Sequence, residues 1–290
     1  MKLNGIRFCL FCILALTACS KTEEARKQLQ QARLLYENKQ FSAAKNAIDS
    51  LRMWYPRELE VLKEALVLMR QAERGESERN IAFCDSLMPV RMEEAGKLKK
   101  GFVFEKDSVY EETGNYVWKQ QIIERNVERS YVRCGVDEKG EIYLASVYFG
   151  KRPINHTGLK LSLPDGTYAE TASIPYDGGL NYRFKDEGNI TEVVTCKDEN
   201  SLSAIHFVCA SAEKARIKVE YTGGTTFSLY LSENDRKAIR ATYDLAVVLK
   251  DIEFMRREKE KSMKKIRYID SKLAGNGEAE NTPSAADETN

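Results

Sequence analysis

Hydrophobic positions along the chain follow two different periods, and the change between them divides the sequence into three zones. From residue 22 to 98, apolar residues recur every three or four positions, which is the period of an amphipathic helix. Between residues 101 and 231, apolar and polar residues alternate, and β-branched and aromatic residues are frequent, as in half-buried strands. The helical period returns from residue 232 to 273. The order is therefore helix, β and helix, and we predict an α+β fold.

The first zone, within residues 19–100, predicts a series of helices. Its second helix ends before Pro56, because proline disfavours the helical conformation of the residue that precedes it. Pro89 is expected to be a boundary or a kink within the last stretch. The predicted helices are Glu23–Glu37, Phe41–Trp54, Glu58–Arg74 and Glu76–Lys100.

The middle zone, residues 101–231, predicts a run of short strands. Turn sequences such as Pro164-Asp165-Gly166 and Thr222-Gly223-Gly224 separate strands that are spaced about ten residues apart. No helical stretch is recognised between them, so an antiparallel sandwich- or barrel-like domain is expected rather than a parallel sheet with crossover helices. The predicted strands are Phe102–Phe104, Tyr116–Ile123, Ser130–Val136, Ile142–Phe149, Leu159–Leu163, Tyr168–Ala172, Leu180–Phe184, Thr191–Cys196, Ala204–Cys209, Arg216–Tyr221 and Thr226–Leu231.

The last zone predicts one long amphipathic helix over residues 232–273. Ser232 is the expected N-cap, and Asp235 lies where a capping box places its acidic residue. The apolar stripe of this helix needs a partner, and so do the N-terminal helices. We therefore expect them to pack antiparallel, with the β-domain at one end of a helical stalk. Residues 274–290 are rich in Gly, Asn, Pro, Ser and acidic residues and are expected to form a disordered tail.

The N-terminus has the pattern of a secretory signal. Lys2 and Arg7 form a positively charged region before a short apolar run, Phe8–Ala15, and small residues follow the run. The sequence Leu16-Thr17-Ala18-Cys19 resembles the lipobox of bacterial lipoproteins. The resemblance implies that residues 1–18 are a cleaved signal peptide and that Cys19 is the acylated first residue of the mature chain. The alternative is an ordinary signal peptide with a cysteine near its end.

The same resemblance implies where the protein is held. A lipobox cysteine is expected to carry three acyl chains, and two or more chains hold firmly because each buried methylene contributes about 0.8 kcal/mol. Ser20 follows Cys19 where an aspartate would retain a lipoprotein at the inner membrane, so an outer-membrane location is expected. Ser20–Glu24 also resembles surface-export signals of Bacteroidota lipoproteins, and an ordinary solvated helix start is the alternative. The face of the membrane, periplasmic or external, stays open.

The first two predicted helices resemble one tetratricopeptide unit, in which small side chains let two antiparallel helices approach closely. Gln28 and Lys39 depart from the repeat, and no convincing second copy follows. Because repeat arrays need about three units for stability, the resemblance implies a helical hairpin that packs on another element. A generic helical hairpin is the alternative. The matching residues are Ala32, Leu35, Phe41, Ala44, Ile48, Leu51 and Pro56.

The charge balance gives no reason to expect a nucleic-acid partner. The chain has 45 Lys and Arg and 44 Asp and Glu; loss of the signal peptide removes Lys2 and Arg7 and no acids, which leaves 43 against 44. No positive field results from such a balance. The basic cluster Arg256–Arg267 has glutamates interleaved, and it fits a solvated helix face or, alternatively, contact with anionic lipid headgroups.

Cysteine and histidine patterns predict neither a metal site nor a nucleophile. The predicted mature chain keeps Cys84, Cys134, Cys196 and Cys209 besides Cys19. No CxxC spacing occurs, so we favour buried free thiols over disulfides. His156 and His206 are distant in sequence and form no metal-binding motif. A nucleophilic pair such as Cys209 with His156 is conceivable, but no neighbouring residue in the sequence indicates an activated thiol. No catalytic residue and no cofactor are expected.

The β zone leaves binding and hydrolysis as the two candidate functions. Its turn aspartates, Asp165, Asp177 and Asp186, could pair as glycosidase carboxylates, but we expect them to cap their own turns. Its tyrosines could contact a sugar or peptide when exposed. We expect a non-catalytic lipoprotein whose β-domain binds a protein or a glycan, or takes part in envelope assembly. A glycan- or cell-wall-directed hydrolase that uses these loop carboxylates is the alternative. The aromatic set is Tyr116, Trp118, Tyr131, Tyr143, Tyr148, Tyr168, Tyr176, Tyr182 and Tyr221.

Overall fold

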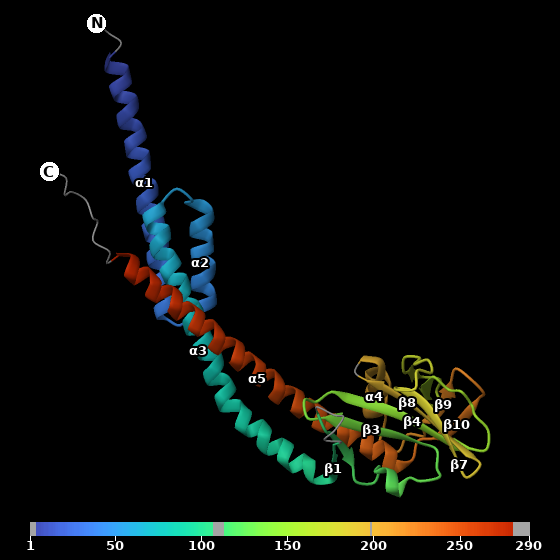
Figure 1. The fold of residues 1–290 in the computed structure, drawn as a ribbon. Helices are drawn as coiled ribbons and strands as arrows, with labels where there is room; N and C mark the ends of the chain where they lie inside the picture. The colour runs from blue at the N-terminus through green and yellow to red at the C-terminus, as the bar shows by residue number, and fades with distance from the viewer. Residues whose placement is uncertain (1–3, 107–112, 198, 281–290) are drawn as a thin grey trace, which may run out of the picture. The chain divides into compact units, whose positions relative to one another are not determined.

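The computed structural model describes the backbone of residues 4–106, 113–197 and 199–280, and within these ranges the side chains from residue 21 to residue 274 (Figure 1). The chain forms two compact units: residues 1–86 with 256–290, which we call the helical unit, and residues 87–255, which we call the β unit. Their boundaries fall inside two long helices, α3 (Leu59–Leu98) and α5 (Glu233–Glu280), each of which contributes a part to both units.

The helical unit starts with an antiparallel pair, α1 (Asn4–Glu37) and α2 (Phe41–Trp54), followed by the first part of α3. The bounds predicted for α2 are confirmed. Lys39, where the tetratricopeptide repeat usually has glycine, adopts a positive φ of 59° between the two helices. Alanines and larger apolar residues interlock between α1, α2 and α3. This core consists of Ala25, Leu29, Ala32, Ile48, Leu51, Val61, Ala65 and Leu68.

Within the helical unit, the end of α5 packs antiparallel to α3. Ile269 of α5 is buried there, and ion pairs join the two helices. Residues 73 and 74 of α3 pair with residues 265 and 270 of α5, whereas residue 85, further along α3, pairs with the earlier residue 259, so the two helices run antiparallel. The pairs are Arg74–Asp270 at 2.9 Å, Glu73–Lys265 at 3.5 Å and Asp85–Lys259 at 2.5 Å.

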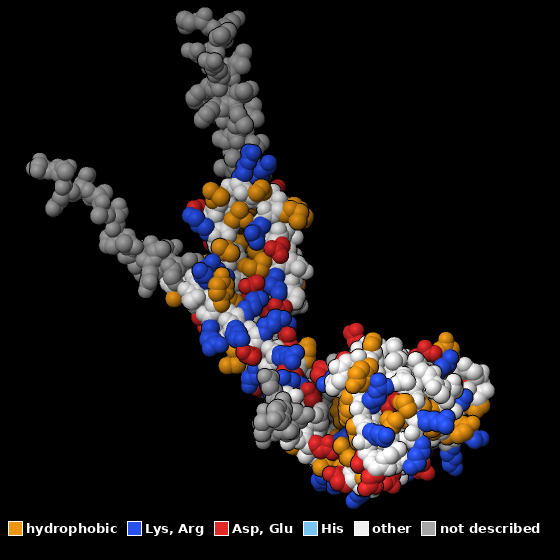
Figure 2. Space-filling view, turned by 45° about the vertical axis from the view of Figure 1, so that its right-hand side comes forward, with side chains coloured by type: hydrophobic (Ala, Val, Ile, Leu, Met, Phe, Trp, Pro, Cys, Tyr) orange, Lys and Arg blue, Asp and Glu red, His pale blue; other side chains and the backbone are white. Residues whose placement is uncertain are grey.

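The basic cluster of α5 is mostly neutralised by neighbouring acids. Lys259 and Lys265 bind carboxylates of α3, and Lys261 and Lys264 pair with glutamates of α5 itself. Figure 2 shows basic and acidic side chains on the face of the helical unit that it presents. These ion pairs favour the solvated helix face as the interpretation of this cluster among the described residues.

The β unit contains two antiparallel sheets among the residues that the structure describes. The larger sheet has the strand order β1-β2-β3-β4-β8-β7, and the smaller one β10-β9-β5-β6. Neither closes into a barrel, and the α+β fold expected from the sequence is confirmed. The strands are β1 (Phe102–Glu105), β2 (Asn115–Trp118), β3 (Tyr131–Asp137), β4 (Ile142–Gly150), β5 (Gly158–Ser162), β6 (Tyr168–Glu170), β7 (Asn181–Asp186), β8 (Asn189–Lys197), β9 (Lys218–Thr222) and β10 (Phe227–Tyr230).

Two predictions for this zone are wrong. The expected strand Ala204–Cys209 belongs to a helix, α4 (Glu199–Ala210), whose buried residues follow the helical period. These residues are Ser201, Ala204, Ile205 and Val208. The expected strand Tyr116–Ile123 ends at Trp118, because Gln121 turns inward and its side chain binds the backbone of β3 at Val132 and Cys134.

Pro89 is not a helix boundary, because α3 continues through it to Leu98. Proline inside a helix removes one backbone hydrogen bond at a cost of about 3 kcal/mol. The turns after Pro89 contact the rest of the β unit: Ala95 is buried in its core, and Arg91 forms a 3.0 Å ion pair with Asp251 of α5.

The core of the β unit lies between the inner faces of the two sheets and is completed by α4 and the first part of α5. It includes Leu144 of β4, Leu161 of β5, Ile205 of α4 and Leu245 of α5. Figure 1 shows the orange part of α5 running along the strands of this unit. No helix of the described residues is long and apolar enough to cross a membrane.

Ser232 caps α5 as predicted, with Asp235 bound to its hydroxyl rather than to its backbone N–H as in a full capping box, and the cap is also tied to the larger sheet. The backbone N–H of Asp235 donates to Ser232 Oγ at 3.1 Å, and that hydroxyl donates to the Asp235 carboxylate at 2.7 Å. The same carboxylate accepts hydrogen bonds from Gln121 at 3.0 Å and Arg129 at 3.2 Å. The cap therefore fixes where α5 begins relative to the strands. α5 itself runs to Glu280, beyond the predicted end at residue 273.

Candidate functional site

The outer face of the six-stranded sheet is hollowed into a groove of about 510 Å³. Side chains alternate along each strand, so that even-numbered residues of β4 and β8 enter the core and odd-numbered residues face the groove. Ala145, Val147 and Val193 form an apolar floor, and Thr191 and Thr195 of β8 add hydroxyl groups beside it.

A loop after β2 forms one wall of this groove. It contains a short 3₁₀ helix, Ile123–Arg125, and the side-chain amide of Asn126 donates to the carbonyl groups of Gln120 and Ile122 at 2.9 and 2.8 Å. These bonds hold the loop in place while Ile123 and Val127 stay exposed. The groove is therefore preformed, as small-ligand sites usually are.

Aromatic residues from β7 form the other side of the groove. The rings of Tyr182 and Phe184 are nearly parallel, with centroids 6.5 Å apart and an interplanar angle of 17°, and both are exposed. Tyr131 and Tyr143 reach the groove from β3 and β4. Burial raises the pKa of Tyr143 to about 12, so its hydroxyl is neutral near pH 7 and available for hydrogen bonding.

An ion pair between two groove residues is already formed. Arg133 of β3 binds Glu105 of β1 at 2.5 Å, and the Arg133 side chain is 13% exposed. Its Nε atom is buried and has no hydrogen-bond partner among the described residues. A buried donor without a partner is costly, and because this atom is covered, a ligand oxygen reaches it only if the Arg133 side chain moves.

The predicted aromatic set is therefore split between the groove and other places. Tyr131, Tyr143 and Tyr182 line the groove. Tyr148 and Tyr221 are buried in the core. Tyr116 and Trp118 pack against phenylalanines of β1, and Tyr168 and Tyr176 are exposed outside the groove.

The turn aspartates do not form a catalytic pair. Asp165 accepts hydrogen bonds from Thr167, and Asp177 accepts the backbone N–H groups of Gly179 and Asn181, each at 2.9 Å. These bonds lower the pKa of both aspartates. The expectation that they cap their own turns is confirmed. Asp186, by contrast, lies on the rim of the groove.

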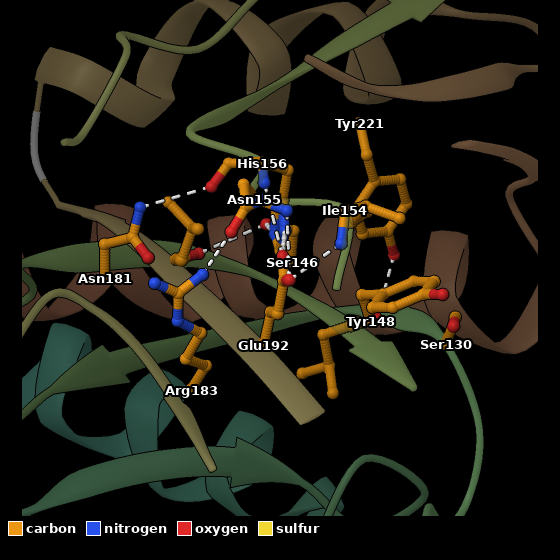
Figure 3. Close-up of polar contacts among 12 residues, drawn as sticks. Ser130, Ser146, Tyr148, Ile154, Asn155, His156, Asn181, Arg183, Glu192 and Tyr221 are labelled. Carbon is orange, nitrogen blue, oxygen red and sulfur yellow. Dashed lines mark hydrogen bonds and ion pairs between the residues drawn. The ribbon is translucent and has the colours of Figure 1, made fainter. Parts of the chain in front are cut away.

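A second polar cluster, Ser146, His156 and Glu192, has the connectivity of a serine–histidine–acid triad (Figure 3). Ser146 Oγ lies 2.8 Å from His156 Nε2, and His156 Nδ1 lies 2.9 Å from Glu192 Oε2. Sequence reasoning missed this cluster, since it considered Cys209 as the partner of His156. A signal existed: Glu192 is a carboxylate at an inward-facing position of the alternating strand β8.

The burial of this cluster argues against nucleophilic catalysis. All three residues are at most 2% exposed, and they lie on the core side of the sheet, away from the residues that line the groove. The Glu192 carboxylate also accepts the backbone N–H groups of Ile154, Asn155 and His156, at 2.8, 3.0 and 3.2 Å. The cluster thus anchors the loop between β4 and β5 to β8 rather than presenting a nucleophile.

The protonation state of the cluster follows from these contacts. Burial lowers the pKa of His156, and the hydrogen bonds from the backbone and from His156 lower that of Glu192 despite its burial. A neutral imidazole then donates a hydrogen bond from Nδ1–H to the Glu192 carboxylate and accepts one at Nε2 from the Ser146 hydroxyl.

This arrangement predicts acid sensitivity of the β unit. Both groups have folded-state pKa values below their ordinary values of 6.5 and 4.5, so the unfolded chain binds more protons and stability falls as the pH falls. We expect the unfolding temperature to decrease from pH 7 to pH 4, with His156 contributing first. Thermal unfolding at several pH values checks this, and His156→Gln should flatten the upper part of the profile. An equally steep profile in that variant would contradict the assignment.

The remaining chemistry-bearing residues take structural places. Cys84, Cys134 and Cys196 are buried and Cys209 is half-buried, all as free thiols, as predicted. Burial raises the pKa of Cys209 to about 11, which keeps it unreactive. His206 lies on α4 rather than on a strand and contacts Tyr243 edge-on. The described residues contain no cluster of potential metal ligands, and the Cys19 side chain lies outside the described residues.

Comparison with known proteins gives no further guidance, because no protein-family model, no curated protein and no solved structure matches this chain.

Proposed function

We propose that this protein is a non-catalytic lipoprotein of the bacterial outer membrane, anchored through Cys19, whose β unit binds a short glycan in the groove of the six-stranded sheet. The observation that supports this proposal most is the combination of an apolar floor with the exposed parallel rings of Tyr182 and Phe184. Flat aromatic faces pack well against the C–H faces of sugar rings, and surrounding polar groups then bind the hydroxyls.

The charge of the groove favours an uncharged ligand. Acidic and basic side chains nearly balance, and Arg133 is already paired with Glu105. A strongly acidic or basic partner would meet repulsion from part of the wall. The charged residues that line the groove are Glu105, Glu128, Asp186 and Glu187 on the acidic side, and Arg129, Arg133 and Lys197 on the basic side.

The alternative, a hydrolase that uses loop carboxylates, has less support. Two of its three candidate acids, Asp165 and Asp177, are engaged in their own turns and have lowered pKa values. A general acid needs the opposite shift, a carboxyl pKa raised toward neutrality. Binding without turnover is therefore the better interpretation of the groove.

Blocking the groove floor tests the proposal. Val193→Arg places a long cation in the centre of the groove, and we expect oligosaccharides released from the bacterial envelope to bind at least about tenfold more weakly. Tyr182→Ala is expected to weaken binding by a smaller factor, because it removes one stacking surface. Native mass spectrometry or calorimetry with the delipidated chain measures both effects.

Val247→Arg is the matched control, because Val247 is exposed on α5 of the β unit, outside the groove. It should bind like the unaltered protein. Retained glycan affinity in Val193→Arg, or product formation from the bound oligosaccharide, would contradict the proposed function.

A further inference from the structure

Three large apolar side chains lie exposed around the turn between α2 and α3. Met53 and Trp54 end α2 and Leu59 begins α3, and each is between 66 and 73% exposed. Apolar side chains of this size are normally covered when they gather at one place on a folded unit. We call Met53, Trp54 and Leu59 the apolar corner.

The apolar corner lies beside the first α1 residues whose side chains the structure describes. Thr22 Oγ1 donates to the Glu58 carboxylate at 2.7 Å, and Tyr55 Oη donates to that of Glu24 at 3.4 Å. Both contacts lie within the helical unit. Figure 1 shows the α2–α3 connection at the end of this unit where α1 enters, and Figure 2 shows hydrophobic side chains gathered there.

This position brings the corner close to the predicted acylation site. Cys19 is three residues before Thr22, and three residues span at most about 11 Å in any conformation. The chemistry of the corner suits a membrane interface. Tryptophan is enriched there because its ring is apolar and its indole N–H can stay hydrated.

We infer that the apolar corner docks onto the surface of the lipid bilayer, with Trp54 and Met53 in the interfacial layer. The inference rests on the proposed acylation of Cys19, which holds the corner at high local concentration against the membrane, so that a small contact suffices. The anchor and the corner together give two points of attachment and fix how the helical unit stands on the membrane. Charges around the corner are mixed, so docking should not need anionic lipid. They are Lys21, Glu23, Glu24, Arg57, Glu58 and Glu60.

The fluorescence of Trp54 tests the inference directly. The chain has two tryptophans, and Trp118→Phe leaves Trp54 as the only reporter. We expect the acylated full-length protein, reconstituted in phosphatidylcholine vesicles, to emit at shorter wavelength than the detergent-free delipidated chain. It should lose most of its Trp54 intensity when the vesicles contain brominated acyl chains, and phosphatidylglycerol should leave both results unchanged.

A reporter elsewhere in the same unit provides the matched control. Trp54→Phe with Phe83→Trp, in the same Trp118→Phe background, places the indole at an exposed position of α3 and should give water-like, unquenched emission. Leu59→Asp with Met53→Asp changes only exposed positions, so it should leave the fold intact while the Trp54 emission returns toward that of water.

The outcomes separate the two proposals. If mass spectrometry shows acyl chains on Cys19 and Trp54 is nevertheless unquenched, the docking inference is wrong and the anchor stands. A blue shift that grows with protein density but is insensitive to brominated lipid means that a second copy covers the corner, and it also overturns the inference. Absence of acyl chains overturns both the anchor and the docking.

Discussion

Glu192→Ala is expected to lower the unfolding temperature of the β unit by about 10 °C. The carboxylate accepts three backbone N–H groups of the β4–β5 loop and the Nδ1–H of His156, and all of these bonds except the one from Asn155 are buried. Removing it leaves buried donors without partners and a cavity at β8. Breaking a buried charged network of this kind costs about 3–5 kcal/mol, and 1 kcal/mol corresponds to about 2–4 °C in a unit of this size.

The two tryptophans allow this effect to be assigned to one unit. Trp118 is in the β unit and Trp54 in the helical unit, so Trp54→Phe makes emission report the unfolding of the β unit alone. Glu187→Gln, in the exposed β7–β8 turn, is the control and should leave the transition within about 0.5 kcal/mol of the unaltered protein. Glu192→Gln keeps one acceptor oxygen and should fall between the two. A transition unchanged in Glu192→Ala would show that the loop is held by other contacts.

The regular elements of this protein were largely predictable because their side chains obey simple periods. Alternation along β4 places Leu144 and Tyr148 in the core and Val147 in the groove, and the sequence contains that alternation. The helix α4 was missed because β-branched and aromatic residues around Ile205 imitate a strand. The helical spacing becomes evident only when Ser201 is known to be buried.

The candidate sites were less predictable, for reasons of distance and order. β4 pairs with β8 rather than with β5. This pairing brings Ser146 and Glu192 close together, although β5, β6 and β7 lie between them in the sequence. No local pattern specifies such a pairing. The aromatic residues of the groove were foreseen as a set, but which of them face outward depended on the register, because a one-residue shift reverses every side chain. The exposure of Trp54 in the apolar corner likewise depends on how α3 packs against the end of α2.

Gly224→Ala is expected to destabilise the β unit by about 3 kcal/mol through the same loop that Glu192 holds. A Cβ atom at Gly224 would overlap the carbonyl oxygen of Ile154 and lie 2.7 Å from that of Asn155. Backbone atoms cannot rotate aside as a flexible side chain does, so the loop itself must move. That movement breaks the hydrogen bond from the Thr225 N–H to the Ile154 carbonyl, at 2.8 Å, and draws the loop away from Glu192.

Gly179, which follows Gly178 in the turn before β7, supplies the control for this prediction. At Gly179 a Cβ atom meets nothing closer than 3.8 Å, and Gly179 does not have the positive φ of its neighbour Gly178. Gly179→Ala should therefore change the stability by no more than about 0.5 kcal/mol. Hydrogen exchange adds a local measurement, since Gly224→Ala should expose the amides of Ile154, Asn155 and His156. Equal stability of the two alanine variants would mean that the β4–β5 loop can move without a cost in free energy. The Glu192 carboxylate would then move with the loop instead of holding it in place.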